Sequence, residues 1–565
     1  MPRARGNPAA TRHCHDTEPM SHPARQPCRP RRPRRGRRLR TRALAFALSA
    51  ALALPAPALH ARSALPVLGD SASEDLAVGD ERRLGQQIMR SVRTDPLYLD
   101  DPILLEYVQS LWDPLVDAGR RLGHIGDDTD AAFGWELFLV RDRAVNAFAL
   151  PGGFVGVYLG LVALTASGDE LASVLAHELS HVTQRHIARG IGSSQRVGVV
   201  ATVAMILALL AASRAGNADA AQAAIVGGQA AMLQGQLDFT REMEREADRV
   251  GFAMLEAAGF APQGMASMFE RLAFANRLMD DNAFPYLRSH PLTTERIAEA
   301  RGRLPDAQAT HAGSALHALM RARARVLMAQ GAEQWHALAA DGDEAATKGV
   351  DRAAAAEAGA AAAAHAQRAL ALARLRDRPG VDREARALLR AAQAPALDAA
   401  TRRAAHRIAA EAWIAADAPA EAAAALDEAG AADGRPGRLL QAELAGVRAR
   451  LEPGAPAPAG ARRQAEALQV WTAERSDDAL AWALLARSAR AAGLPLRAQR
   501  ADAEARAALG DLPGAVDRMR GAQRIAAEAG AGAGADPIEQ QAIDARLRVL
   551  QRELDALRAQ SREAR

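Results

Sequence analysis

Two histidines spaced four residues apart form the most informative pattern in this chain of 565 residues, within His177-Glu178-Leu179-Ser180-His181. Positions i and i+4 of an α-helix share one face, so both imidazoles can point at one metal ion. Glu178 falls beside that face, where its carboxylate can hold a water that the metal has acidified and accept its proton during attack on a carbonyl. A solvated helix with two histidines is the alternative, because so short a pattern also occurs by chance.

A catalytic zinc site needs a third protein ligand and keeps its fourth position open. The segment Arg241–Asp248 offers three glutamates and one aspartate in a helical pattern. Charged runs of this kind usually form a solvated face. Glu244 stands out because Asp248, four residues later, can reach the same side and accept the free ring N–H of a zinc histidine.

The two segments together resemble the HtpX-like and CAAX-prenyl-endopeptidase group of gluzincins, in which a helix carrying HExxH is followed by a helix carrying ExxAD. Glu244-Arg245-Glu246-Ala247-Asp248 fits the second motif. The resemblance implies a zinc metalloendopeptidase with one Zn²⁺ per chain, held by His177, His181 and Glu244. It implies Glu178 as the catalytic base and a supporting or proton-donor role for Asp248.

The likeness covers residues 75–305 and is greatest for exported members of the group that join the protease to tetratricopeptide repeats. It includes residues 146–153, 177–185, 244–251, 289–291 and 294–296. These relatives imply polypeptide substrates, namely misassembled outer-membrane proteins, and the outer-membrane protein assembly machinery as a partner. Over the C-terminal half the likeness is only architectural.

His290 stands alone in a turn-forming Ser-His-Pro context. It can stabilise the oxyanion of a tetrahedral intermediate, or it can occupy the open zinc position in a latent form and act as a switch. A structural turn histidine is the alternative. His317, His336, His365 and His406 show no ligand spacing, and no role is assigned to them.

Hydrophobic periodicity predicts the elements that position these residues. Helix is expected from about Asp75 to Gly123, and short strands at residues 136–140, 144–150 and 154–158. The motif helix is expected to begin at a capping box of Ser167 and Glu170 and to run to about Arg189, with Gly190 as its stop and with Arg185 and His186 at a solvated end.

The strand at residues 144–150 precedes the motif helix directly, which favours it as a sheet edge where an extended peptide substrate can add. An ordinary core strand is the alternative. A segment without charge, residues 197–212, is too short to span a bilayer comfortably. It predicts a buried helix or one that makes peripheral contact with a membrane.

The N-terminus looks like a secretory signal peptide. Residues 1–42 hold 13 arginines against Asp16 and Glu18, and the apolar stretch 43–59 is followed by Leu59-His60-Ala61. We expect cleavage near Ala61 and a periplasmic location. An uncleaved anchor is the alternative, and a start at Met20 would shorten the leader to an ordinary length.

Removal of this leader changes the net charge and the cysteine content. The whole chain carries +4 and the leader +11, so residues 43–565 sum to −7, which speaks against a nucleic-acid partner. Both cysteines, Cys14 and Cys28, lie in the leader. The remaining chain therefore has neither disulfides nor a thiol nucleophile.

After about Pro305 the chain becomes alanine-rich and helical. Gly493 and Gly510 lie 17 residues apart, half of the tetratricopeptide period, so both are expected at corners of a helical-hairpin solenoid. A plain helical bundle is the alternative. Linkers are expected at residues 341–357 and 453–460.

The predicted fold class is mainly α: a gluzincin domain with a small β-sheet, followed by an all-α, tetratricopeptide-like solenoid. The expected divisions are a signal peptide (1–61), a metalloprotease domain (62–305) and a repeat domain (306–565). Two rivals remain. One is a non-proteolytic periplasmic chaperone or adaptor that acts through its repeats, and the other is an integral membrane peptidase anchored by residues 43–59 and 197–212.

Overall fold

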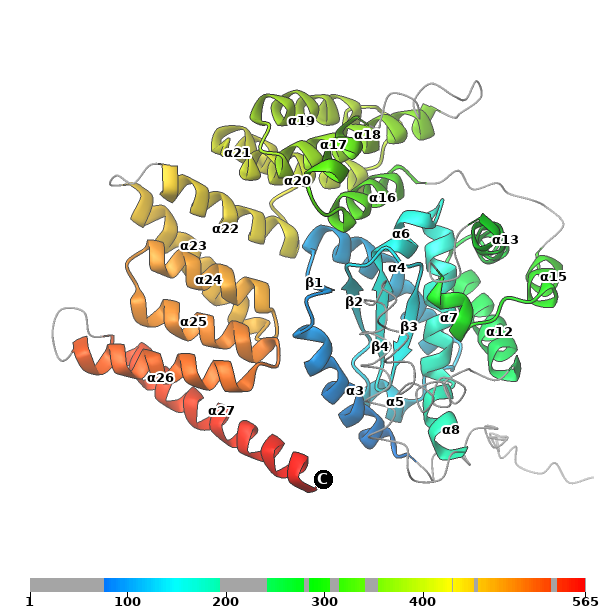
Figure 1. Cartoon of the computed structure of the whole chain (residues 1–565), viewed down its shortest axis with the longest axis horizontal. Helices are drawn as coiled ribbons and strands as arrows, with labels where there is room; N and C mark the ends of the chain where they lie inside the picture. Colours follow the sequence, from blue (N-terminus) through cyan, green and yellow to red (C-terminus); the bar gives the residue numbers. More distant parts are fainter. Residues whose placement is uncertain are drawn as a thin grey trace, which may run out of the picture. The chain divides into compact units, whose positions relative to one another are not determined.

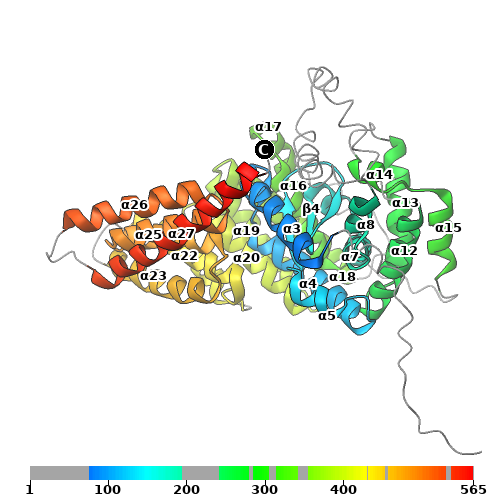
Figure 2. The ribbon, with the colours of Figure 1, turned by 90° about the horizontal axis from the view of Figure 1, so that it is seen from below.

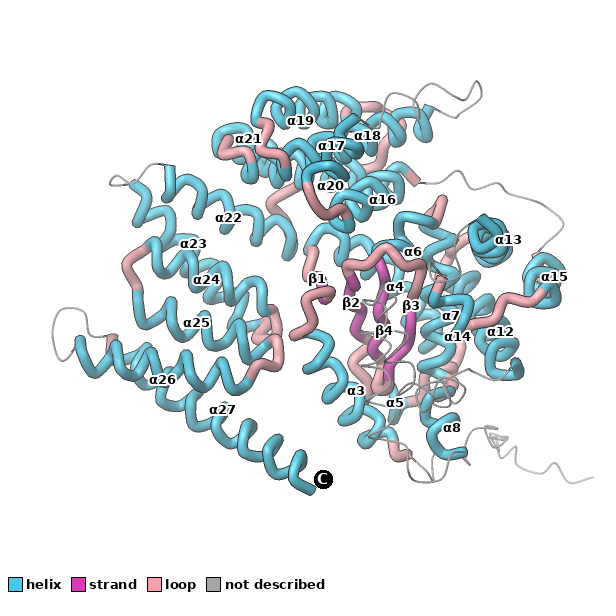
Figure 3. Tube along the Cα trace, in the orientation of Figure 1, coloured by secondary structure: helices cyan, strands magenta, loops and turns pink. Residues whose placement is uncertain are grey.

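The computed structural model describes residues 76–193, 241–278, 284–304, 314–340, 354–428, 430–451, 456–529 and 536–563. All of these residues belong to one compact unit, Pro66–Arg565. The predicted leader at 1–61 and the uncharged segment at 197–212 lie outside the described residues. Figure 3 shows that helices make up most of the described chain and that the strands form one small sheet.

The sheet has four strands in the order β1-β2-β4-β3 (Figure 1). Strand β2 runs parallel to β4, and the other two pairs are antiparallel. The apolar run of β4 is buried at every position, as expected for a strand with neighbours on both sides. The strands are β1 (Tyr98–Leu99), β2 (Glu136–Val140), β3 (Ala147–Leu150) and β4 (Phe154–Tyr158). The three predicted strands are thus present, although the one expected at residues 144–150 begins only at Ala147.

Helices pack around this sheet and around one another. Helix α7 packs against β3 and α4, and α12 and α13 pack against α7. The helices of this half are α3 (Val78–Arg93), α4 (Pro102–Arg121), α5 (Asp127–Ala132), α6 (Leu159–Leu164), α7 (Gly168–Thr183), α8 (His186–Ser193), α12 (Arg241–Ala257), α13 (Gln263–Leu278), α14 (Pro285–Ser289) and α15 (Thr294–Gly302).

The sequence of helix α4 explains where the helix begins and which face is buried. The Asp101 side chain caps it by accepting a hydrogen bond from the backbone N–H of Leu104, and Pro102 occupies the first turn, where no N–H is needed. Leu104, Val108 and Leu115 recur at helical spacing and are fully buried. The predicted helical entry segment is therefore helix in α3 and α4, with β1 between them.

The C-terminal half consists of helices that pack against their neighbours along the chain (Figures 1 and 2). They are α16 (Ala315–Met328), α17 (Ala332–Ala340), α18 (Ala354–Arg374), α19 (Arg378–Ala392), α20 (Ala399–Ala415), α21 (Pro419–Asp427), α22 (Gly434–Leu451), α23 (Pro456–Glu474), α24 (Ala479–Ala491), α25 (Pro495–Ala508), α26 (Leu512–Ala529) and α27 (Pro537–Glu563).

Two predicted corners of this half are confirmed. Gly493 lies between α24 and α25 with a φ of 72°, and Gly510 lies between α25 and α26 with a φ of 87°. Both angles are in the left-handed region that glycine adopts without a steric penalty. Both predicted linkers are partly wrong, because the chain is helical from Ala354 onward and again from Pro456 onward.

One hydrophobic core runs across the predicted boundary at residues 305 and 306. It contains α4, α7 and α12 together with α16, α18 and α20, and extends to Val447 in α22. Two smaller cores lie farther along the chain: one is shared by α22–α25, and the other lies mainly under α26 and α27. Division of the chain at residue 305 stays a prediction.

Candidate metal centre

Helix α7 holds the histidine motif in a buried position. Ser167 is its N-cap and accepts a hydrogen bond from the backbone N–H of Glu170, whose carboxylate accepts one from the N–H of Ala166. Ser167 thus caps the helix as predicted, whereas Glu170 binds the N–H of the residue before the cap and not the N–H of Ser167 that a capping box requires. Every residue from Glu170 to Val182 is buried. The motif therefore lies on a rigid element.

Helix α12 brings the second predicted segment against α7. A Cβ at Gly251 would lie 3.1 Å from the backbone of Ala176, which is tighter than nearly all real contacts. Glycine at this position lets the two helices approach closely. The approach places Glu244 and Asp248 opposite the motif histidines.

Four buried side chains offer metal-ligand atoms that all lie within 4.8 Å of one another: His177, His181, Glu244 and His290. The Nε2 atoms of His177 and His181 are 3.0 Å apart. The Glu244 carboxylate lies 3.4 Å from His177 Nε2 and 3.5 Å from His181 Nε2. Two imidazoles and one carboxylate are a donor set that suits zinc. The structure therefore brings the three predicted ligands together.

Glu178 supplies a test of this interpretation. Its side chain is fully buried, and neither carboxylate oxygen has a hydrogen-bond partner in the part of the chain that the structure describes. The ring of His290 approaches one oxygen to 3.5 Å. A buried carboxylate that accepts no hydrogen bond is costly in a purely structural setting. Its position beside the ligand cluster fits a group that handles a proton there.

The electrostatics of the cluster favour a positive charge. Burial by itself lowers the pKa of His177, but the carboxylates of Glu244 and Asp248 raise it to about 9. Burial raises the pKa of Glu244, yet the neighbouring His290 and His177 bring it far below its usual range. A cation among these groups would replace the proton that they otherwise attract.

Asp248 lies behind His177 rather than in the cluster. Its Oδ1 is 3.0 Å from His177 Nδ1, and Arg296 of α15 binds both of its oxygens, at 2.7 and 2.8 Å. Arg296 also lies 2.8 Å from Glu244. Asp248 is therefore placed to hold the ring of His177, which favours the supporting role over that of a proton donor.

His290 enters the cluster from the end of α14. Its Nδ1 lies 2.9 Å from Glu244 and 3.3 Å from His177 Nε2. The backbone N–H of His290 donates to Tyr286 O, and the N–H of Tyr286 donates to Val145 O, two residues before the start of β3. His290 is thus a potential fourth ligand, and the segment that carries it is anchored beside β3.

Strand β3 lies at the end of the strand order, as the substrate-edge hypothesis requires, and among the described residues it pairs only with β4. The Tyr158 N–H donates to Asn146 O, so the alternation of an antiparallel pair directs the backbone groups of Phe148 toward β4. Those of Ala147 and Ala149 then face away from it.

The predicted end of the motif helix is wrong. Helix α7 stops at Thr183, and Arg185 has a φ of 51°, so the chain turns and α8 begins at His186. Arg185 is held there by hydrogen bonds to the buried Glu81 and to Leu76 O. His186 is fully buried rather than solvated. Helical periodicity could not reveal this, because i and i+5 do not share a face of a continuous helix.

The remaining histidines lie away from this cluster. His317 is fully buried and contacts the hydroxyl of Tyr107 at 2.6 Å and the carbonyl oxygen of Thr165 at 3.0 Å. It is a structural residue that joins α16 to the segment before α7. Among the described helices, none is both long and apolar enough to cross a membrane.

Comparison with known proteins agrees with this geometry. Residues 123–304 match the family model described as Peptidase family M48. A "Putative beta-barrel assembly-enhancing protease" of Vibrio cholerae is 39% identical over 263 residues, which cover 46% of this chain and 52% of the relative. The "Beta-barrel assembly-enhancing protease" of Escherichia coli is 36% identical over 239 residues, 42% of this chain and 47% of the relative.

A more distant relative is the "Mitochondrial metalloendopeptidase OMA1" of Schizosaccharomyces pombe. It is 34% identical over 174 residues, which cover 31% of this chain and 48% of the relative. The chain spans about half the length of the curated relatives it matches.

Proposed function

We propose that this chain, whose residues 123–304 match the model of peptidase family M48, is a zinc-dependent endopeptidase. One observation carries the proposal. Three buried histidines and Glu244 converge in one cluster, and the fully buried Glu178 lies beside it, 3.5 Å from His290 and without a hydrogen bond from the described residues. Hydrolysis of a peptide bond needs a base at such a position.

Each side chain has a separate task in this proposal. When bound, a zinc ion would supply a Lewis acid that polarises the peptide carbonyl and makes a water molecule more acidic. His177, His181 and Glu244 would hold it. Glu178 would accept a proton from the attacking water and return it to the leaving nitrogen. Asp248 and Arg296 would keep the ring of His177 in place.

The substrate would be an extended polypeptide. Ala147 and Ala149 direct backbone donors and acceptors away from β4, so a substrate strand can add to this edge. Helix α7 packs against the same strand. Pairing at β3 would therefore present a peptide bond close to the metal ligands.

His290 would regulate this site or take part in the reaction. A complete set of four protein ligands is typical of a closed zinc site, whereas catalysis needs an open position. His290 would thus hold the centre latent until substrate displaces the segment anchored at Val145. In an open centre the same ring could instead stabilise the oxyanion.

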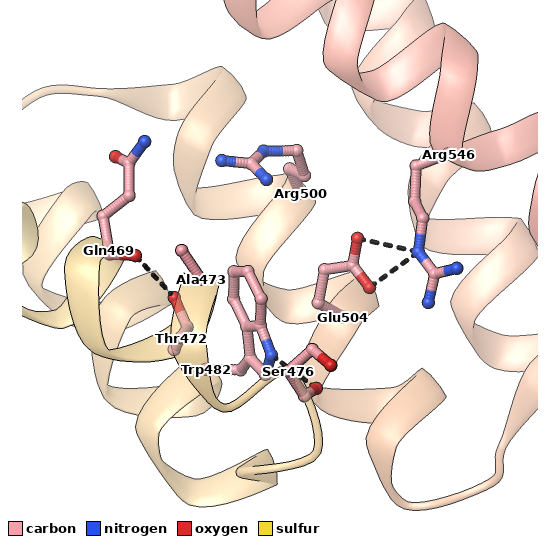
Figure 4. A pocket seen from close by; sticks show the side chains of 8 residues that line it. All are labelled: Gln469, Thr472, Ala473, Ser476, Trp482, Arg500, Glu504 and Arg546. Atoms are coloured by element: carbon pink, nitrogen blue, oxygen red, sulfur yellow. Dashed lines mark hydrogen bonds and ion pairs between the residues drawn. The ribbon is translucent and has the colours of Figure 1, made fainter.

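The C-terminal helices would select substrates or bind a partner, as a tetratricopeptide-like solenoid does. A pocket of about 380 Å³ lies among α23, α24, α25 and α27. Figure 4 shows Arg500 and Arg546 approaching it from different helices, with Glu504 bonded to Arg546 and the indole of Trp482 below. The indole and the two arginines belong to the side-chain types that are enriched at protein–protein interfaces, so this pocket would contact a polypeptide.

The location and the physiological substrates are proposed from the leader and from the names of the relatives. Residues 1–61 would direct export to the periplasm, and the substrates would be misassembled outer-membrane proteins. The repeat half would dock on the outer-membrane protein assembly machinery. A peripheral contact of residues 197–212 with the membrane belongs to the same proposal.

The rival function, a non-proteolytic periplasmic chaperone or adaptor that acts through its repeats, is not favoured, because the similar proteins are named as proteases or endopeptidases.

Metal content and casein cleavage, measured on the purified wild type and on Glu178→Gln and His290→Ala, test the proposal. We expect about one zinc ion per chain in wild type and Glu178→Gln, with cleavage about 10²–10⁴-fold lower in Glu178→Gln. A rise in cleavage for His290→Ala would indicate latency, and a fall would indicate a direct role.

Three other outcomes would contradict the proposal. Zinc in all three proteins without cleavage in any would favour the adaptor. A wild type that binds no zinc would refute the metal centre, and equal cleavage by wild type and Glu178→Gln would refute the role of Glu178.

A further inference from the structure

The ring of His181 is supported on the side that faces away from the metal ligands. Its Nδ1 lies 2.8 Å from Nδ1 of His186, and Nε2 of His186 lies 3.0 Å from the Glu246 carboxylate. Arg189 contacts the same carboxylate oxygen at 2.9 Å. Both rings are fully buried. The four side chains come from α7, α8 and α12.

When His181 binds a metal, the hydrogen bonds that link His181, His186 and Glu246 can run in only one direction. The Nε2 atom of His181 faces the cluster and must present its lone pair, so the ring proton is on Nδ1. His186 must accept that proton at its own Nδ1 and therefore carries its proton on Nε2. Glu246, an acceptor, completes the chain. A doubly protonated His186 would put a second donor against His181 Nδ1 and prevent this tautomer.

His177 is also held at its Nδ1 atom, the ring nitrogen that faces away from the ligand cluster. Nδ1 of His177 faces Asp248, and Arg296 binds Asp248 from behind. For His181 the carboxylate is one ring farther away, and Arg189 takes the place of Arg296. Each predicted metal-binding histidine is thus supported by a carboxylate and an arginine. His177 contacts its carboxylate directly, whereas His181 is linked to Glu246 through His186.

The turn at Arg185 makes this arrangement possible. In a continuous helix His186 would point about 140° away from His181, because five residues turn through 500°. The left-handed conformation of Arg185 ends α7 and lets His186 fold back onto the ring. A side chain that looks like an exposed helix end in the sequence thereby becomes part of the metal centre.

We propose that His186 and Glu246 are positioning residues that fix the tautomer and orientation of His181 for metal binding. The proposal rests on the proposed zinc centre and assigns a role to two residues outside the ligand set. Neither touches the reacting atoms. Their effect should therefore appear in the binding of the metal itself.

Zinc affinity, measured by competition with a chromophoric chelator, tests this proposal on the full chain. His186→Leu keeps the bulk of the side chain without its hydrogen bonds, and we expect zinc binding about 10–100-fold weaker. Glu246→Gln should show a smaller loss in the same direction. His186→Gln, whose amide offers both an acceptor and a donor, should recover part of the affinity. Glu242→Gln, an exposed position on the same helix, is the matched control.

The absorption spectrum of the cobalt(II)-substituted protein gives a second readout, because it reports ligand geometry and a purely structural role would leave it unchanged. Wild-type zinc affinity and cobalt spectra in both His186→Leu and Glu246→Gln would overturn the proposal. If His186→Leu fails to fold, Glu246→Gln decides, since this side chain is partly exposed. A wild type that binds no zinc would instead refute the metal centre.

Discussion

Three acidic residues within five positions of α12 each contact at least one buried histidine. Glu244 lies in the ligand cluster with His290, Glu246 contacts His186, and Asp248 contacts His177. In the sequence these residues look like a solvated charge run. Their partners lie on other helices, so each carboxylate acquires a distinct role only through packing.

His317 provides a test at the residue scale, because it is buried and its partners are uncharged. Burial lowers its pKa to about 4, below the usual 6.5 of an unfolded histidine. Between these values the unfolded chain binds more protons, so the stability from a neutral His317 is complete above pH 6.5 and is lost as pH falls toward 4. The loss amounts to about 3 kcal/mol.

His317→Gln cannot titrate, so we expect the difference in free energy of unfolding between wild type and variant to shrink as pH falls from 7 to 4. Urea unfolding of both proteins at several pH values measures it. A difference that stays constant over this range would show that His317 does not become protonated on unfolding.

Two secondary-structure elements position the residues around the candidate metal centre: the end of α7, which places His186, and the edge strand β3. Arg185 is held by Glu81, which is buried on α3 and whose pKa is raised by burial despite the pairing. Loss of this ion pair would release the turn that places His186. Strand β3 is the complementary case, since its outward backbone groups lie beside the anchor of the His290 segment.

Ala149→Pro tests the proposed substrate edge. Proline removes the outward N–H of Ala149 without removing a hydrogen bond between β3 and β4. We expect zinc content to be unchanged and kcat/KM for a peptide substrate to fall on the order of tenfold, the value of about one hydrogen bond. Ala149→Val, which keeps the N–H, is the control. Equal losses in the two variants would argue for altered packing instead of a lost substrate contact.

For the molecule as a whole, three arginines from the C-terminal half meet carboxylates at the start of α4. Arg323 of α16 binds Asp101, Arg407 of α20 binds Glu106, and Arg435 of α22 binds Asp100. The pair of Arg323 and Asp101 is buried, and Asp101 is also the N-cap of α4. Charge pairs and a shared apolar core therefore join the two halves of the chain.

Arg323→Ala would leave Asp101 buried without its partner. We expect the free energy of unfolding to fall by about 3–5 kcal/mol, as when one member of a buried ion pair is removed. Arg325→Ala, an exposed position on the same helix, should change it by less than about 0.5 kcal/mol. Thermal or urea unfolding followed by circular dichroism measures both. Similar stability of the two variants would contradict a role for this pair in joining the halves.

Local patterns along the chain predict the ligand set and the elements that carry it. The spacing of His177 and His181 and of Glu244 and Asp248 depends on the geometry of one helix, and the cap at Ser167 and the corner at Gly493 depend on local backbone chemistry. Such features need no knowledge of distant neighbours.

The residues that surround the predicted ligands, in contrast, are set by contacts between elements far apart along the chain. His186 reaches His181 because Arg185 adopts a left-handed conformation stabilised by Glu81, more than 100 positions earlier in the chain. The core that crosses residue 305 likewise depends on the packing of α16 against α4 and α6. These contacts join elements far apart in sequence, and their geometry follows from how the helices pack against one another, which periodicity along one helix does not encode.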